Sequence, residues 1–352
     1  MKHKTILLLV ILSVLVVPFS SMLAADNQAN LDAVKTYLLG KATDLVDGSK
    51  TLTESTDAYY ELAKAANFDY AQLWKDKQKD VAATLDVAKK QWIVISPIYE
   101  QMEGIVAGVP SLSNFDAIID ASPSGEEDPD NAVDFSVTLP SGDKLEKPGA
   151  LFNMLESTLW GTEPKYVSDA KIDIDGDGTI GFGDELPDAN VAKGAADALA
   201  SYSADLLKAA NAWEPNESDA FTALVVMVPT MSEYFGSWKT SRFVEGDAAT
   251  GKNFSVISRL SDIKDILSSL QVIYDGVSPM IDAKSPQQHA QINQGLTDLK
   301  AFVEDIFKQE QDGKRFKPEE ADLFGTEAQD RAQTITGQIT QAAALLDITI
   351  QE

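Results

Sequence analysis

The most regular spacing of acidic residues lies between positions 173 and 184, which read Asp-Ile-Asp-Gly-Asp-Gly-Thr-Ile-Gly-Phe-Gly-Asp. Aspartates take the first, third, fifth and twelfth places, and a glycine stands sixth, where a chain wrapped around an ion must turn sharply. Calcium takes about six to eight oxygen ligands, and this spacing supplies several of them from one short segment. The pattern therefore predicts a calcium loop, with ligands from Asp173, Asp175, Asp177 and Asp184 and from the backbone of Thr179.

The predicted loop differs from those of regulatory calcium sensors. Its twelfth residue is aspartate, as in the loops of dockerin modules that it resembles, and Glu185 beside it competes for that role. Sensors pair two loops, whereas this sequence has one. We expect a structural clip that joins two helices and fixes their mutual angle, with Ile180 packed inward and a water near Gly181. The alternative is an acidic turn that holds no ion.

Most of the surrounding sequence has helical periodicity. Leu31, Val34, Leu38, Leu45 and Leu52 recur at spacings near three, four and seven, with charged residues between them. Similar patterns predict further helices over residues 69–85, 87–106, 151–161, 190–213, 218–238, 260–281, 286–307 and 326–346. Pro97 predicts a bend in the helix that contains it.

One segment, 122–149, interrupts this periodicity with an alternating apolar and polar stretch before a Pro-Ser-Gly-Asp turn, which predicts a small β-hairpin. We therefore predict an all-α chain of two helical-bundle halves, with one EF-hand-like calcium loop and a small β-hairpin insertion. The expected divisions are a signal peptide at 1–25, an N-terminal bundle at 26–165, the calcium-loop insertion at 166–190 and a C-terminal bundle at 191–352.

The first residues predict export. A basic start, Met-Lys-His-Lys, is followed by an apolar run from Ile6 to Val17 and by small residues that end at Ala25. This order is typical of a secretory signal peptide, and the apolar run is short for a transmembrane helix. We expect a protein of the periplasm or cell surface, without a membrane span once the signal is removed. The alternative is an uncleaved membrane anchor.

Composition argues against several chemistries. The absence of cysteine removes disulfides, thiolate metal sites and lipoprotein acylation. One of the two histidines lies in the signal peptide, which leaves His289 alone and disfavours a zinc hydrolase site. The net charge of −26 repels nucleic acid and attracts metal ions. The sequence contains neither a phosphate loop nor a nucleophile motif.

The stretch 149–161, Gly-Ala-Leu-Phe-Asn-Met-Leu-Glu-Ser-Thr-Leu-Trp-Gly, resembles the signature helix of the imelysin-like family, in which His-x-x-Glu precedes an apolar pair, Trp and Gly. Other segments resemble that family in order and spacing, namely 99–103, 115–120, 201–213, 265–276 and 342–348. The resemblance covers most of the chain outside the calcium loop and the hairpin insertion. It implies an exported fold of two helical bundles, found in bacterial iron-uptake proteins and in proteins once described as peptidases.

The resemblance also implies a second metal site, on the His and Glu of the signature helix. In this sequence Asn153 takes the place of that histidine, beside Glu156. Carried over by position, Glu100, Glu103 and Asp116 would join them. Carboxylates and an amide oxygen favour calcium, magnesium, manganese or ferric iron over copper or zinc. The alternative is that these residues are polar groups hydrogen-bonded between helices.

Three functions remain open from the sequence. The first is a non-catalytic, exported imelysin-like protein that binds calcium in a structural role. It would also bind a second metal ion, such as iron, or a metal-bridged anion. Its role would be in iron uptake, with a membrane permease or cell-envelope partner. The second is a cell-surface structural or interaction protein with a decayed metal site. The third, a metallopeptidase, is disfavoured because asparagine stands at the candidate histidine position.

Overall fold

The protein is an arrangement of long helices, described by a computed structural model over residues 29–351. The predicted signal peptide therefore lies outside the described residues. Helix accounts for 71% and strand for 4% of the described residues, which confirms the predicted all-α class. Among the described residues, no helix combines the length and apolar character needed to cross a membrane.

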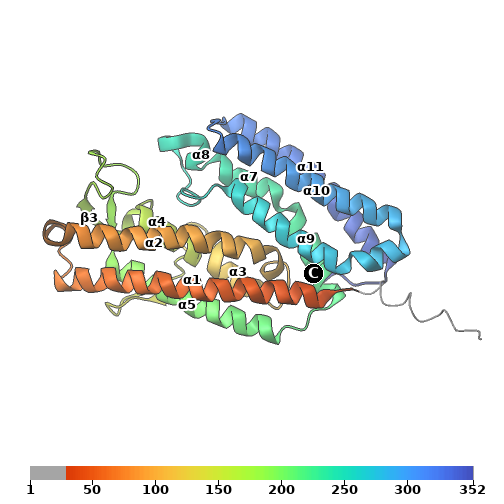
Figure 1. Cartoon of the computed structure of the whole chain (residues 1–352), viewed down its shortest axis with the longest axis horizontal. Helices are drawn as coiled ribbons and strands as arrows, with labels where there is room; N and C mark the ends of the chain where they lie inside the picture. Colours follow the sequence, from red (N-terminus) through yellow and green to blue (C-terminus); the bar gives the residue numbers. More distant parts are fainter. Residues whose placement is uncertain (1–28, 352) are drawn as a thin grey trace, which may run out of the picture.

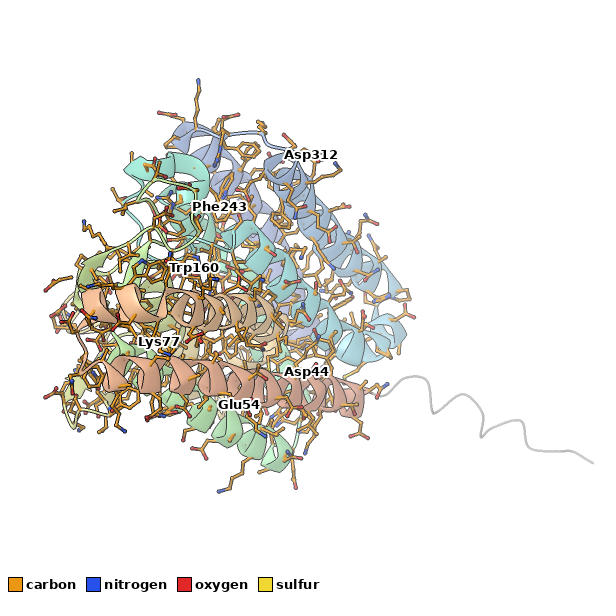
Figure 2. The ribbon with its side chains drawn as sticks, turned by 60° about the vertical axis from the view of Figure 1, so that its left-hand side comes forward. Asp44, Glu54, Lys77, Trp160, Phe243 and Asp312 are labelled. Atoms are coloured by element: carbon orange, nitrogen blue, oxygen red, sulfur yellow. The ribbon has the colours of Figure 1, made fainter. Side chains whose placement is uncertain are left out.

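The first bundle consists of α1 (Leu31–Ala65), α2 (Tyr70–Val106), α4 (Leu151–Trp160) and α5 (Ala189–Ala212). The periodic apolar residues of α1 are buried against α2 and α5, as their spacing predicts. Charged residues between them, such as Asp44 and Glu54, point to solvent (Figure 2). In Figure 1, α1, α2 and α5 lie side by side along the long axis of the molecule.

Helix α2 replaces two predicted helices. It is one element from Tyr70 to Val106 that contains a kink, and at its start the Asp69 side chain accepts a hydrogen bond from the Gln72 amide and so caps the helix. The backbone departs from helical angles at Lys77, whereas the predicted bend was at Pro97, which lies inside the helix. The C-terminal part of α2 is the most buried and carries the acidic residues of the site.

The second bundle consists of α6 (Glu217–Met227), α7 (Met231–Lys239), α9 (Arg259–Lys284), α10 (Pro286–Gln311) and α11 (Pro318–Leu345). The single helix predicted over 218–238 is divided at Pro229, because proline lacks the amide that would continue the helix. A short turn, η3 (Val228–Thr230), joins the two pieces. The bundle is tilted across the first one (Figure 1).

The two bundles share one continuous hydrophobic core, and α2 packs directly on α9. Gly104 permits this close approach, because a β-carbon there would lie 2.4 Å from the hydroxyl oxygen of Ser269 in α9. Just beyond α2, Gly108 lies equally close to α6, where a β-carbon would be 2.6 Å from the Cα of Ala223. The expected boundary at residue 191 would assign α5 to the second bundle. Its contacts with α1 and α4 place it in the first, so the second bundle begins at α6.

Short elements connect the helices. After α2 come α3 (Ser113–Asp116) and a π-helical turn, η1 (Ala117–Ala121). Strands β1 (Ser136–Thr138) and β2 (Lys144–Glu146) form the small hairpin that the sequence predicts within 122–149. The remaining short elements are η2 (Pro164–Tyr166), β3 (Val167–Lys171), β4 (Glu185–Pro187), α8 (Arg242–Glu245) and η4 (Gly246–Ala248).

Candidate metal centre

A cluster of buried carboxylates lies where the two bundles meet. Glu100 and Glu103 come from α2 and Asp120 from η1, and one carboxylate oxygen of each lies within 4.8 Å of the others. Their exposed fractions are only 1%, 3% and 4%. Asp116 and Glu156 are also buried, so the structure brings four of the five predicted residues into this region, together with Asp120.

Arg259, at the start of α9, supplies positive charge to the cluster. Its guanidinium nitrogens lie 3.3 Å from Asp262, 3.5 Å from Glu100 and 3.9 Å from Asp120. These separations exceed the roughly 2.7–2.9 Å of a strong charge-assisted hydrogen bond, and Arg259 Nε has no partner. One guanidinium therefore pairs loosely with several acids rather than tightly with one.

Tyrosine hydroxyls hold two of the acids in place. Tyr99 donates to Asp116 at 2.8 Å, and Tyr234 donates to Glu103 Oε1 at 2.9 Å. The second oxygen of Glu103 is buried with no hydrogen-bond partner, which is costly for a carboxylate. Glu103 is therefore oriented by one bond and has one oxygen available as a ligand.

Burial raises the pKa of most of these acids. Removal from water raises the pKa of Asp120 to about 7, and the Glu103 carboxylate adds to the effect while Arg259 opposes it. Burial likewise raises the pKa of Glu156 to about 7 and holds those of Glu100, Asp116 and Asp262 well above their usual range. The cluster therefore contains more carboxylates than Arg259 can neutralise.

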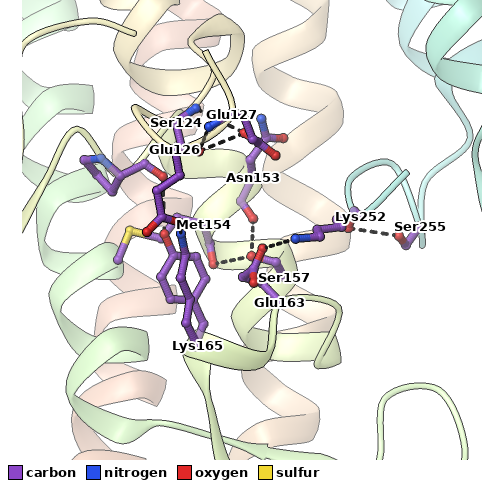
Figure 3. A network of polar contacts seen from close by, with 12 residues as sticks. Ser124, Glu126, Glu127, Asn153, Met154, Ser157, Glu163, Lys165, Lys252 and Ser255 are labelled. Carbon is purple, nitrogen blue, oxygen red and sulfur yellow. Dashed lines mark hydrogen bonds and ion pairs between the residues drawn. The ribbon is translucent and has the colours of Figure 1, made fainter. Parts of the chain in front are cut away.

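Asn153 does not join the cluster. It lines a separate polar pocket, with Ser124, Glu127 and Lys252 among its neighbours (Figure 3). Glu156, one turn further along α4, instead accepts a hydrogen bond from the Ser255 amide at 2.6 Å. The prediction that Asn153 and Glu156 present ligands to one cavity is wrong, because the two side chains enter different surroundings.

The predicted calcium loop is compact. One carboxylate oxygen from each of Asp173, Asp175 and Asp177 lies within 4.8 Å of the others. Asp184 is buried, and its two oxygens accept from the amides of Ile174 and Gly181 at 3.0 and 2.7 Å. Thr179 donates to Asp177 through both its amide and its hydroxyl. The structure thus brings three of the predicted acids together and places the fourth at the base of the loop.

The surroundings of this loop differ from the expectation. It connects the antiparallel strands β3 and β4 rather than two helices, and Glu185 belongs to β4, where it pairs with Lys171. An ion there would therefore brace a hairpin and not set an interhelical angle. Ile180 is 58% exposed rather than packed inward, and the loop that carries it projects beyond the helices (Figure 1).

Contacts tie the hairpin to the first bundle and to α8. Apolar residues at its base pack on the far ends of α1 and α2, and Lys89 of α2 donates to the Gly183 carbonyl at 2.8 Å. Across the hairpin, the guanidinium of Arg242 lies 4.1 Å from the centre of the Phe182 ring. The hairpin therefore touches both the first bundle and α8, through neighbouring residues on the β4 side of its loop.

The fold and the buried acidic centre define an all-α protein of two bundles with a polar site at their junction. The family model described as Imelysin (Peptidase_M75) matches residues 33–347, so the chain belongs to the imelysin family. This confirms the resemblance to the family that the signature helix and the ordered segments indicate. No curated protein matches the chain.

Sequence reasoning did not assign Arg259, Asp262 or Asp120 to the site. Asp120 follows Asp116 at a spacing of four, which local helical periodicity would have placed on the same side. Arg259 and Asp262 are also one turn apart. The chain has only four arginines, and an arginine is a common partner for buried acids. Nothing local, however, indicates that residue 259 lies beside residue 100.

Proposed function

We propose that this imelysin-family protein is exported, is not an enzyme, and binds a hard metal cation at Glu100, Glu103 and Asp120. The export proposal rests on the signal-like first residues, which also support a periplasmic or cell-surface location. The proposed cargo is ferric iron or another hard cation, taken up with a membrane permease or cell-envelope partner. Calcium at 173–184 would act as a structural clip.

The observation that carries this proposal is the unpartnered oxygen of Glu103 in a cluster that contains more carboxyl groups than positively charged groups. Burying a carboxylate without a counter-charge is expensive, and the single guanidinium of Arg259 makes only long contacts. A cation bound between the three acids would satisfy the free oxygen and neutralise the excess charge. Protons are the competing source of neutralisation.

The ligand chemistry favours hard cations. The three side chains offer oxygen atoms only, and sulfur and imidazole are absent from the described residues of the cluster. Oxygen donors suit calcium, magnesium, manganese and ferric iron better than copper or zinc. Three carboxylates within 4.8 Å match a cation of high charge, since each added carboxylate strengthens its attraction.

The calcium clip has separate support. Three acids converge at the tip of the β3–β4 hairpin, and backbone amides of the loop already orient Asp173, from Gly176 at 2.7 Å and Gly178 at 3.0 Å. Because the base of the hairpin packs on α1 and α2, an ion that stiffens the loop stabilises this end of the first bundle.

One alternative also has structural support. The acidic cluster is almost inaccessible in this conformation, which fits a structural or cell-surface interaction protein whose metal site has decayed. A metallopeptidase has less support. It needs a metal-bound water and a general base, and His289 lies on α10 against Tyr274 and not in the cluster.

Terbium(III), a hard cation that takes oxygen ligands, tests the proposal. Ions bound per chain are counted after removal of free metal at physiological salt, where scattered surface acids bind weakly. We expect about two ions in the native protein and about one in Glu103→Gln, since the buried site loses a charged ligand. Asp177→Asn should also retain about one ion, at the buried site.

The matched control is Glu54→Gln, which removes one exposed carboxylate from α1 and should leave the count unchanged. Tyrosine-sensitised luminescence gives an independent reading, because Tyr99 and Tyr234 contact acids of the cluster. A native count that Glu103→Gln does not reduce would contradict the buried site and favour the structural alternative.

A further inference from the structure

A segment without regular secondary structure covers the acidic cluster. Residues 249–257, here called the cover segment, connect η4 to α9. The Phe254 ring lies over the Arg259 guanidinium, with its centre 4.2 Å from the central carbon, and Tyr234 lies 4.5 Å away from the same carbon. The adjacent Ser255 amide donates to Glu156. Two consecutive residues of the cover segment thus contact the charged centre directly.

A small number of polar contacts hold the closed position, together with the packing of Val256 against the hydrophobic core and a hydrogen bond from the Thr250 amide to Glu245 at 3.2 Å. The Gly251 amide donates to the Thr240 carbonyl at 3.0 Å, and Lys252 forms an ion pair with Glu163 at 2.6 Å that is partly exposed (Figure 3). Exposed ion pairs of this kind contribute little because water competes for both charges. No residue of the cover segment belongs to a helix or strand, so its release would break no helical or sheet ladder.

The backbone of the cover segment is also strained where it meets the cluster. Phe254 has φ of 54°, a left-handed conformation that is unfavourable for a residue with a bulky side chain. Such strain persists when surrounding contacts compensate for it, and here the compensating contact is the stack on Arg259. Loss of that stack would favour movement of the segment.

There is room for such movement. A cavity of about 590 Å³ lies beside the cover segment and is lined by Gly161, Phe182, Arg242 and residues 249–252. On its other side, Lys252 and Asn253 border the polar pocket that contains Asn153. The segment therefore runs between two surface depressions and over the buried acids.

We propose that the cover segment is a lid whose opening admits a cation to Glu100, Glu103 and Asp120, and that Phe254 and Ser255 hold it closed. This inference rests on the proposed cation site. It accounts for a cluster that has a free ligand oxygen but almost no exposure, because access requires displacement of a short, weakly held segment.

The first measurement reports lid opening without any cation. The chain has no cysteine, so Ser255→Cys introduces a unique thiol on the buried side of the lid itself, and its reaction with a small thiol reagent reports exposure. In this background, Phe254→Ala removes the stack on Arg259 and should raise the labelling rate roughly 2- to 30-fold. Lys252→Ala should raise it less, by at most about fivefold. Leu323→Ala, on exposed α11, is the control and should have no effect.

The second measurement is the rate of terbium(III) entry, followed by tyrosine-sensitised luminescence in chains that carry Asp177→Asn to empty the calcium loop. Phe254→Ala should accelerate association and dissociation by similar factors, so that the dissociation constant changes much less than either rate. Circular dichroism establishes that each variant is folded, and Lys252→Ala provides a second test if Phe254→Ala does not fold.

The outcomes separate the two proposals. Labelling that Phe254→Ala and Lys252→Ala both leave unchanged would refute the lid, whatever the cation does. Faster labelling with unchanged terbium entry would show that the segment moves but does not control access, which also refutes it. If the labelling rate responds but terbium does not enter the cluster in any variant, the cation site is refuted. The role of the lid in controlling cation access is then refuted as well.

Discussion

Glu156 provides the sharpest test of the electrostatics of the junction. Its side chain is 5% exposed, and burial raises its pKa from 4.5 to about 7, although the Ser255 hydrogen bond acts in the opposite direction. Asp120 raises this pKa further and Arg259 lowers it. We consider the isosteric change Glu156→Gln, which retains an oxygen that accepts from Ser255 but cannot ionise.

The sign of the effect follows from proton binding. Below pH 4.5 the carboxyl is protonated in both the folded and unfolded states and contributes no pH dependence. Between pH 4.5 and about 7 the unfolded chain has released this proton while the folded protein retains it, so the free energy of unfolding falls as pH rises. A shift of about 2.5 pKa units corresponds to about 3 kcal/mol.

The assay is denaturant unfolding at pH 4 and pH 8 in metal-free buffer, because a bound cation would change the charge balance. From pH 4 to pH 8, the free energy of unfolding of Glu156→Gln should rise by about 3 kcal/mol relative to that of the native protein. Raised acids that do not interact with Glu156 change both proteins alike and cancel in the comparison. Glu54→Gln, at an exposed site, should follow the native protein. Parallel pH profiles for native and Glu156→Gln would refute the reasoning.

Two further predictions concern the calcium hairpin and the bundle junction. Calcium at about 100 times its dissociation constant should stabilise the native protein by about 2.7 kcal/mol. Removal of calcium by chelation should lower the melting temperature without abolishing terbium binding at Glu103. An equal effect of calcium on Asp177→Asn would contradict the structural clip. Gly108→Ala should lower the free energy of unfolding, measured with denaturant, by about 1–3 kcal/mol, because its β-carbon would meet the backbone of Ala223. Gly40→Ala, at an exposed position of α1 with no atoms nearby, should instead raise the free energy of unfolding by up to about 1 kcal/mol. Similar values for the two glycine variants would refute the packing argument.

The helices were predictable because burial follows their periodicity. Leu38, Leu45 and Leu52 recur every seven residues and are all buried, so the sequence indicates both the helix and its inner face. Connections were less predictable. Whether a proline ends a helix depends on its packing, since Pro229 divides α6 from α7 whereas Pro97 lies within α2. The strands beside the calcium loop were missed because they are short and mostly partly exposed, which weakens any alternation.

The site was only partly predictable, for a different reason. Glu100 and Glu103 lie one turn apart on α2, so local spacing is enough to pair them. Spacing did not establish that Asn153 and Glu156 share a cavity, because the residues that surround each of them come from elsewhere in the chain. The role of Arg259 cannot be predicted from local sequence, since Arg259 lies beside Glu100 only because α9 packs on α2.

This dependence on packing links the site to the glycines at the junction. Glu103 and Gly104 are consecutive on α2, and the Gly104 amide also lies 3.1 Å from the hydroxyl of Ser269 on α9. A side chain at Gly104 would require Ser269 and Leu270 to shift or α2 and α9 to move apart, because its β-carbon would meet both of these side chains. The first bundle supplies Glu100 and Glu103 and the second supplies Arg259, so a wider junction would separate the acids from their only guanidinium. The balance of charge in the cluster is therefore a property of how the bundles are joined, and neither bundle alone would possess it.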